Sequence, residues 1–190
     1  MSQSQKKTGR LIGDPTKDEL INRFIRVDHA GEDGAKRIYE GQLAILGGSD
    51  DGDVLREMAV AEERHLATFD KLIVERRVRP SALMPLWQVA GFALGAGTAL
   101  LGRKAAMACT AAIEEVIEEH YGDQSTQLEQ LSSKDAEPEL KKVIDDFRAE
   151  EIEHRDIALA NEAEQAPGYP VLSSAIKTGS RLAIWLSERV

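Results

Sequence analysis

The chain contains one short pattern twice: a glutamate followed three positions later by a histidine. Each copy comes after a segment in which a single glutamate lies on a stripe of apolar residues. The residues of this double pattern are Glu32, Glu62, His65, Glu114, Glu151 and His154. Ionised side chains are normally excluded from the helix face that packs into a core. A bare carboxylate at such a position is costly, whereas one that coordinates a metal ion is compensated, so the pattern points to a metal site.

Apolar residues recur with a helical period along almost every long segment, and no segment has a convincing strand pattern. We therefore expect an all-α protein. The expected helices run from Thr16 to Gly47, from 49–53 to about 78, through 107–128, through 140–158, and from about 171 to 190. The first begins with a capping box formed by Thr16 and Glu19. The two halves, roughly 18–77 and 103–163, form a weak internal repeat.

Four helices, each carrying part of the double pattern, match a known template. A glutamate from each of two helices and a Glu-x-x-His pair from each of two others is the signature of ferritin-like di-iron carboxylate bundles. The long link before the third helix fits a bundle with one crossover. We expect a flexible polar N-terminus at 1–17 and a single ferritin-like di-iron domain at 18–190. Its long crossover is apolar, and an extra C-terminal helix is amphipathic.

Residues three apart on a helix share nearly the same face, so each Glu-x-x-His pair can reach one metal region. Glu32 and Glu114 approach from facing helices and could bridge two ions. The four carboxylates carry four negative charges, which two divalent ions neutralise, so that no net charge is buried. Mixed carboxylate and imidazole ligation suits iron or manganese, and zinc less specifically. We expect two iron ions per chain.

Neighbouring carboxylates are weaker candidates. Glu115 falls on a different helix face from Glu114. Glu150 could pair with His154 at a spacing of four, but Glu151 repeats the spacing of the first copy. Glu118, one turn after Glu114, is expected to be solvated at the surface.

Three ring side chains lack the Glu-x-x-His context. For His29 and His120 a role other than metal ligand is favoured, because a lone histidine is weak evidence. Tyr121 lies two turns after Glu114 on the same stripe. It is either a core tyrosine with a satisfied hydroxyl, or it makes a hydrogen bond to a ligand or lies on an electron path.

Composition excludes some classes of function. The 190 residues carry a net charge of -9, which argues against nucleic acid as a partner. The single cysteine, Cys109, allows no intrachain disulfide. The first ten residues are polar and show no signal peptide.

The stretch 80–102 contains no charged residue. Its length is at the edge of a membrane span, but Pro85, Gln88 and several glycines make it a poor one. A single span would also separate the two helix pairs and their ligands. Two alternatives remain, a buried crossover helix or a segment that dips into one leaflet with Trp87 at the interface. The amphipathic segment 171–190 could join the same membrane surface.

Four stretches resemble the demethoxyubiquinone hydroxylase family of ubiquinone biosynthesis, and the resemblance runs from about 21 to 190. The stretches are RVDHAGE (26–32), RVRPSALMPLW (77–87), GFALGAGTALLG (91–102) and EEIEHRDI (150–157). The family places its iron ligands on the same six positions, and its His-Tyr pair matches His120 and Tyr121. Members are di-iron monooxygenases on a ferritin-like bundle that hydroxylate the quinone ring of demethoxyubiquinone.

The resemblance also implies partners and a location. Family members are peripheral membrane proteins that use electrons from NADH, and eukaryotic members act with a lipid-binding accessory protein. We expect membrane contact through 83–101 and 171–190, on the cytoplasmic face of a bacterial inner membrane or the matrix face of the mitochondrial one. The quinone pocket should open toward 83–101. A second copy of the chain is a further candidate partner.

Two rival functions share parts of this pattern. A ferritin or rubrerythrin relative that stores iron or removes peroxide would have the same six ligands without needing the apolar crossover. A helical membrane adaptor that retains an old site would bind no stoichiometric iron.

Overall fold

A computed structural model describes residues 15–49 and 52–190, and most of the predicted flexible N-terminus, residues 1–14, lies outside this part of the chain. The described residues form α-helices, one short 3-10 turn and no strand, which confirms the all-α prediction. The helices are α1 (Lys17–Leu46), α2 (Gly52–Arg76), α3 (Met84–Leu100), α4 (Arg103–Glu129), α5 (Pro138–Ala160), the 3-10 turn η1 (Ala163–Gln165) and α6 (Tyr169–Ser187).

Local sequence explains where the helices begin. The Thr16 hydroxyl accepts a hydrogen bond from the Glu19 backbone N–H (3.1 Å), and the Glu19 carboxylate accepts one from the Thr16 N–H (2.7 Å). The predicted capping box is therefore present at the start of α1. Between α3 and α4 the chain turns at Gly102, whose φ of 108° is favourable only for glycine.

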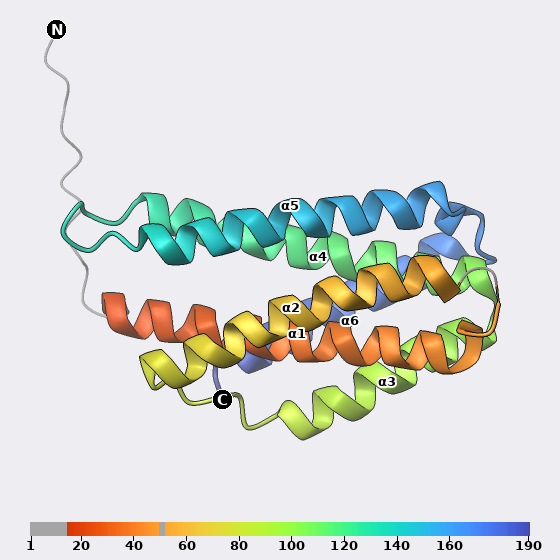
Figure 1. Ribbon diagram of the computed structural model, residues 1–190, viewed down its shortest axis with the longest axis horizontal. Coiled ribbons are helices and arrows are strands. Elements are labelled where there is room, and N and C mark those ends of the chain that lie inside the picture. Colours follow the sequence, from red (N-terminus) through yellow and green to blue (C-terminus); the bar gives the residue numbers. More distant parts are fainter. Residues whose placement is uncertain (1–14, 50–51) are drawn as a thin grey trace, which may run out of the picture.

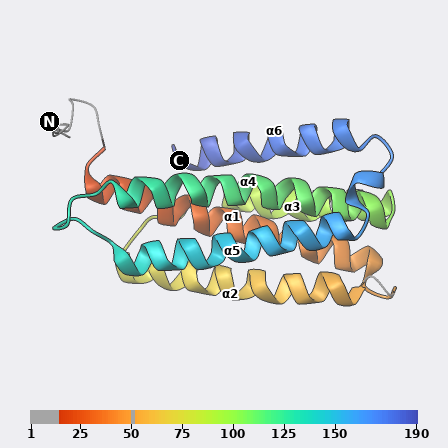
Figure 2. The same cartoon turned by 90° about the horizontal axis from the view of Figure 1, so that it is seen from above.

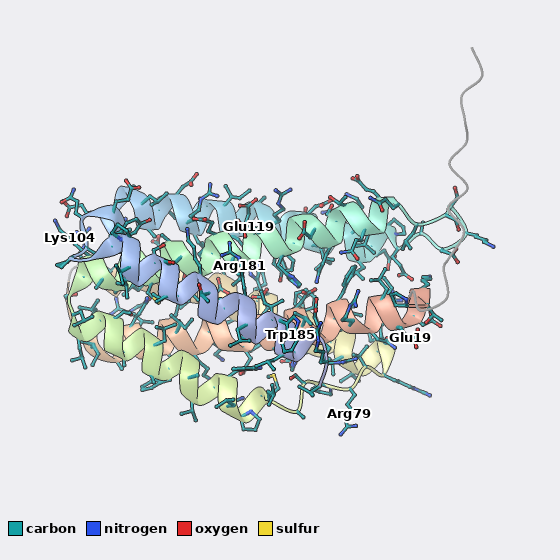
Figure 3. All side chains as sticks on the ribbon, turned by 180° about the vertical axis from the view of Figure 1, so that it is seen from behind. Glu19, Arg79, Lys104, Glu119, Arg181 and Trp185 are labelled. Atoms are coloured by element: carbon teal, nitrogen blue, oxygen red, sulfur yellow. The ribbon has the colours of Figure 1, made fainter. Side chains whose placement is uncertain are left out.

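The helices α1, α2, α4 and α5 form a bundle of two antiparallel pairs (Figures 1 and 2). The first half of the chain supplies α1 and α2, and the second half supplies α4 and α5, as the internal repeat suggested. Helix α3 crosses between the halves and packs on α1, while α6 packs on α4. Figure 3 shows α3 and α6 on the same side of the bundle.

Helix α3 lies unusually close to α1. A Cβ added at Gly95 would lie 2.0 Å from the Ile38 carbonyl oxygen, and one at Gly41 would lie 2.3 Å from the Phe92 carbonyl oxygen. Only glycine fits at such a backbone contact. Helix α3, which forms the crossover, is therefore half-buried: it is neither enclosed by the bundle nor fully exposed. Among the described residues, no helix is both long and apolar enough to span a membrane.

Two apolar clusters lie on either side of the middle of the bundle. One includes Phe24, Phe69 and Phe147, and the other includes Leu55 and Met107. Both are tightly buried. They keep water away from whatever polar groups lie between them.

Candidate metal centre

All six residues of the double pattern meet between these apolar clusters. Helices α1 and α4 contribute one glutamate each, and α2 and α5 contribute one glutamate and one histidine each. None of the six exposes more than 6% of its surface. They form two groups that share Glu62 and Glu151, one completed by Glu32 and His65 and the other by Glu114 and His154. Within each group, the potential ligand atoms lie within 4.8 Å of one another.

Both histidines direct Nδ1 at the carboxylates. The Nδ1 of His65 lies 3.1 Å from Glu151 and 3.5 Å from Glu32. The Nδ1 of His154 lies 3.1 Å from Glu62 and 3.7 Å from Glu151. The two rings are 6.4 Å apart and inclined by only 26°. The arrangement is nearly symmetric about the centre of the bundle.

The atoms that face the centre lack hydrogen bonds. Both carboxylate oxygens of Glu62 and of Glu151, one oxygen each of Glu32 and Glu114, and Nδ1 of both histidines have no hydrogen-bond partner among the described residues. A buried polar atom without a partner costs about 1–3 kcal/mol, and more if charged. Bound cations would remove this cost at all of these atoms together, so the residues fit a pair of metal ions.

Burial dominates the protonation of the carboxyl groups. Burial, reinforced by the charge of Glu151, raises the pKa of Glu62 and Glu114 well above the ordinary glutamate value. Burial also raises the pKa of Glu151. For His65, burial acts in the opposite direction, but the nearby carboxylates of Glu151 and Glu32 raise its pKa to about 12. Without a cation the centre therefore retains protons, which a metal would have to displace.

A tyrosine holds each of the two single glutamates. The Tyr39 hydroxyl on α1 donates to Glu114 on α4 (2.6 Å), and the Tyr121 hydroxyl on α4 donates to Glu32 on α1. Burial raises the pKa of both tyrosines well above 10, so both remain donors. Tyr121 was among the residues predicted at the site, but Tyr39 was not. The signal was available, because Tyr39 follows Glu32 by seven positions, as Tyr121 follows Glu114.

Glu150 contacts a different histidine from the one considered for it. Its carboxylate lies 2.9 Å from Nε2 of His65, and it also accepts a hydrogen bond from Arg64. The alternative pairing with His154 is wrong. Glu150 instead contacts the His65 ring at Nε2, the nitrogen that does not face the other carboxylates. Carboxylates commonly orient metal-binding histidines in this way. In the repeat, the position equivalent to Glu150 is Ala61, so His154 has no corresponding carboxylate from α2.

Other neighbours are accounted for by partners outside the centre. Glu115 forms an ion pair with Lys177 (2.6 Å). Glu118 was expected to be solvated at the surface. It instead forms ion pairs with Arg148 (2.7 Å) and Arg155 (3.2 Å) of α5.

The two remaining histidines lie outside both groups of potential ligands. The Nε2 of His29 lies 2.9 Å from the Asp70 carboxylate. The Nε2 of His120 lies 3.3 Å from Asp28 and 2.8 Å from the Gln124 amide.

A cavity of about 530 Å³ leads to the centre from one side of the bundle. Helices α1 and α4 line it from one side, and α3 and α6 line it from the other. It reaches Glu32 and Tyr121, and its walls are mostly apolar. Trp87 of α3 donates a hydrogen bond to Ser187 of α6 (3.0 Å), which joins these helices where α6 ends. The cavity thus borders the 83–101 stretch, where the quinone pocket was predicted.

Comparison with known proteins gives a consistent result. The model of the family described as ubiquinone biosynthesis protein COQ7 matches residues 19–187. The chain is 64% identical to the 3-demethoxyubiquinol 3-hydroxylase of Rhodospirillum rubrum over 182 residues, which cover 95% of this chain and 84% of the relative. It is 55% identical to the Homo sapiens protein named NADPH-dependent 3-demethoxyubiquinone 3-hydroxylase, mitochondrial, over 172 residues, covering 90% and 78%. With the Saccharomyces cerevisiae 5-demethoxyubiquinone hydroxylase, mitochondrial, identity is 42% over 183 residues, covering 90% and 78%.

Proposed function

This chain belongs to the COQ7 family of ubiquinone biosynthesis proteins, and from that premise we propose that it hydroxylates the ring of demethoxyubiquinone with molecular oxygen. The observation that carries the proposal is the meeting of an apolar cavity with a buried set of carboxylates and imidazoles that lack partners. The cavity would accept an apolar quinone ring, and the buried carboxylates and imidazoles are suited to hold a pair of redox-active metal ions. An iron-storage or peroxide-removing role gains no such support, because it does not require the cavity.

We assign two iron ions to the six residues. The two groups share Glu62 and Glu151, whereas the sequence had suggested Glu32 and Glu114 as the shared pair. Glu32 and His65 would hold one ion and Glu114 and His154 the other, each group together with Glu62 and Glu151. When bound, the iron pair supplies the redox chemistry that activates oxygen for insertion into the ring.

The protein's own side chains prepare this reaction. Tyr39 and Tyr121 hold Glu114 and Glu32 in place by hydrogen bonds. Glu150 would accept a hydrogen bond from Nε2 of His65, which leaves the Nδ1 lone pair free for a metal. The apolar clusters and the cavity walls exclude water, so that the ring rather than solvent meets the centre.

We further propose that the electrons come from NADH. The names of the human and several other relatives specify NADPH, so the two nucleotides should be compared directly. His120 and Tyr121 both line the cavity, and Tyr121 bonds to Glu32. These contacts support a role for the pair between the ring and the centre, either in hydrogen bonding or in electron transfer.

Peripheral attachment to a membrane would deliver the substrate. On α3, Val89 (70%) and Leu100 (71%) are largely exposed, and on α6 so are Val171 (76%) and Leu182 (55%). Exposed apolar groups on α3 and α6, two of the four helices that line the cavity, support a membrane-facing surface. We place it on the cytoplasmic side of a bacterial inner membrane or the matrix side of the mitochondrial one. A lipid-binding accessory protein or a second copy of the chain would contact the same side.

The test is oxygen-dependent conversion of a short-tailed demethoxyquinone by the iron-loaded protein, with NADH or NADPH and a reductant. Isotope-labelled oxygen should appear in a product one oxygen atom heavier, detected by mass spectrometry. The product should be lost in Glu62→Ala. Stoichiometric iron with peroxide consumption and no hydroxylated product would instead support the iron-handling function.

A further inference from the structure

Two glycines in the middle of α1, Gly31 and Gly34, form part of the cavity wall. Glycine destabilises the interior of a helix relative to alanine, because its backbone loses more conformational freedom on folding. The two positions therefore weaken the 30-residue helix that carries the metal-centre residue Glu32. A structural need of the fold or a functional one must offset this cost.

Packing between helices does not require these two glycines. At Gly41, Gly91 and Gly95, where α1 and α3 touch, an added Cβ would lie within 2.7 Å of a backbone oxygen of the neighbouring helix. At Gly31 and Gly34, an added Cβ would meet no atom of the described residues within 4 Å, apart from its own stretch of helix. The missing side chains thus serve no helix contact, and the space that they leave belongs to the cavity.

Two buried oxygen atoms without partners lie beside this open space. Asp28 and Glu32 share one face of α1 with Gly31, line the same cavity, and expose 3% and 1% of their surface. Oδ2 of Asp28 and Oε2 of Glu32 have no hydrogen-bond partner among the described residues. Buried polar atoms are normally paired. Unpaired ones beside open space in a mostly apolar wall indicate a bound molecule that has polar groups on an apolar frame.

We infer that the substrate ring lies flat against the α1 backbone at Gly31 and Gly34, and that these two glycines determine how bulky its substituents can be. Carbon atoms in contact lie about 3.5–4.0 Å apart, so a methyl group on this wall would push the ring away from Glu32. On the facing wall, Gly179 of α6 leaves similar space. The inference rests on the proposed function and adds to it the residues that decide which rings fit beside the metal centre.

Substitutions that fill this space test the inference. Gly31→Ala and Gly34→Ala each add one methyl group to the wall, and Gly34→Leu adds a larger side chain. The Kd of a short-tailed demethoxyquinone is measured by isothermal titration calorimetry on the iron-loaded protein, in the buffer of the activity assay but without oxygen. We expect Kd to rise about tenfold for each alanine and about a hundredfold for the leucine, because one methylene in an apolar pocket can change binding by about 10- to 200-fold.

Thermal stability separates this effect from a damaged fold. Each alanine variant should raise Tm by about 1–4 °C, because alanine favours the helix more than glycine does. A protein that becomes more stable and yet binds its ligand more weakly has not lost its fold. The matched control is Gly97→Ala, since Gly97 is exposed on α3, has equally open space at its Cβ position and does not line the cavity. This control should leave Kd unchanged.

A second ligand, with the same tail but no methyl or methoxy group on its ring, locates the effect. It should bind the alanine variants almost as tightly as the wild type, because its smaller ring leaves room for the added carbon. An equal loss for both ligands, an unchanged Kd in Gly34→Leu, or no binding to the wild type would overturn the inference, even where the wild type hydroxylates its substrate. If binding depends on the two glycines as expected but no hydroxylated product forms, the ring site stands and the proposed function fails.

Discussion

The Tyr39 hydroxyl donates a 2.6 Å hydrogen bond to Glu114, across the bundle from its own helix. Tyr121 makes the reciprocal bond, from α4 back to Glu32 on α1. Each single glutamate is therefore held by the tyrosine that follows the other one. The internal repeat of the sequence becomes an exchange of hydrogen bonds between two facing helices.

This exchange predicts that the two tyrosines act on different metal ions. Tyr39→Phe removes the partner of Glu114 and should weaken the ion held with His154, whereas Tyr121→Phe should weaken the ion held with His65. Each loss leaves a buried oxygen unpaired, at a cost of about 1–3 kcal/mol. Stepwise titration with Co²⁺, followed by its absorption bands, measures the two affinities. Equal weakening of both ions by both variants would contradict the prediction.

Removing a ligand should have a larger effect than removing its neighbour. Glu114→Ala should abolish hydroxylation and lower the iron retained per chain. Glu115→Ala is the control, because Glu115 forms an ion pair with Lys177 away from the centre. Metal analysis after gel filtration measures retention. Full hydroxylation by Glu114→Ala would refute the assignment of this ligand.

Glu150 should strengthen the binding of one ion without contacting it. Glu150→Gln weakens the support for the His65 ring, and loss of such a partner typically lowers metal affinity by about 10- to 100-fold. The effect should fall on the ion held with His65, since Ala61 occupies the equivalent position in the repeat. Competition with a chelator gives the affinity. An unchanged value would mean that Glu150 is only a surface partner of Arg64.

The stability of the metal-free protein should fall as pH rises. The raised pKa values of Glu62, Glu114 and Glu151 mean that the folded state retains protons that the unfolded chain has released above about pH 4.5. His65, with its pKa raised to about 12, also binds its proton more tightly in the folded state. Both effects have the same sign, because the folded state binds more protons, so the free energy of unfolding decreases with pH.

Calorimetry of the metal-free, chelated protein between about pH 5 and pH 8 measures this trend as a decrease in Tm. This range lies above 4.5, the ordinary pKa of glutamate, where the unfolded chain has released its protons. Glu114→Gln should reduce the slope, because it removes one of the groups that retain a proton. Iron loading should reduce it further, since the metal takes the place of the protons. A Tm that rises over this range would contradict the assigned pKa directions.

The membrane-facing surface predicts which apolar residues matter for vesicle binding. Phe92→Asp and Leu100→Asp on α3 should each reduce co-sedimentation with anionic phospholipid vesicles by about tenfold, since burying such a side chain is worth about 1.5–3 kcal/mol. Val74→Asp is the control, because Val74 is 75% exposed on α2, a helix that does not line the cavity. Equal losses in all three variants would indicate nonspecific adhesion.

Periodicity, one capping box and spacing were enough to predict the four helices of the bundle and the six candidate ligands that they carry, but not helix α3. These features are local: a glutamate on an apolar stripe is visible in one helix at a time, and the repeat of Glu62 and His65 as Glu151 and His154 is visible by comparison of two segments. Tyr39 was also visible in this way, through its seven-residue spacing from Glu32. It was missed because a buried tyrosine is common in any core.

The partners of these residues depended on tertiary structure. Which histidine Glu150 contacts, which arginines bind Glu118, and which oxygen of Asp28 remains unpaired all depend on how helices from distant parts of the chain face one another. The close approach of α3 to α1 decided that the crossover is half-buried and that a cavity forms beneath it. Helical spacing determines which face a side chain occupies, but only packing between helices determines what lies opposite that face.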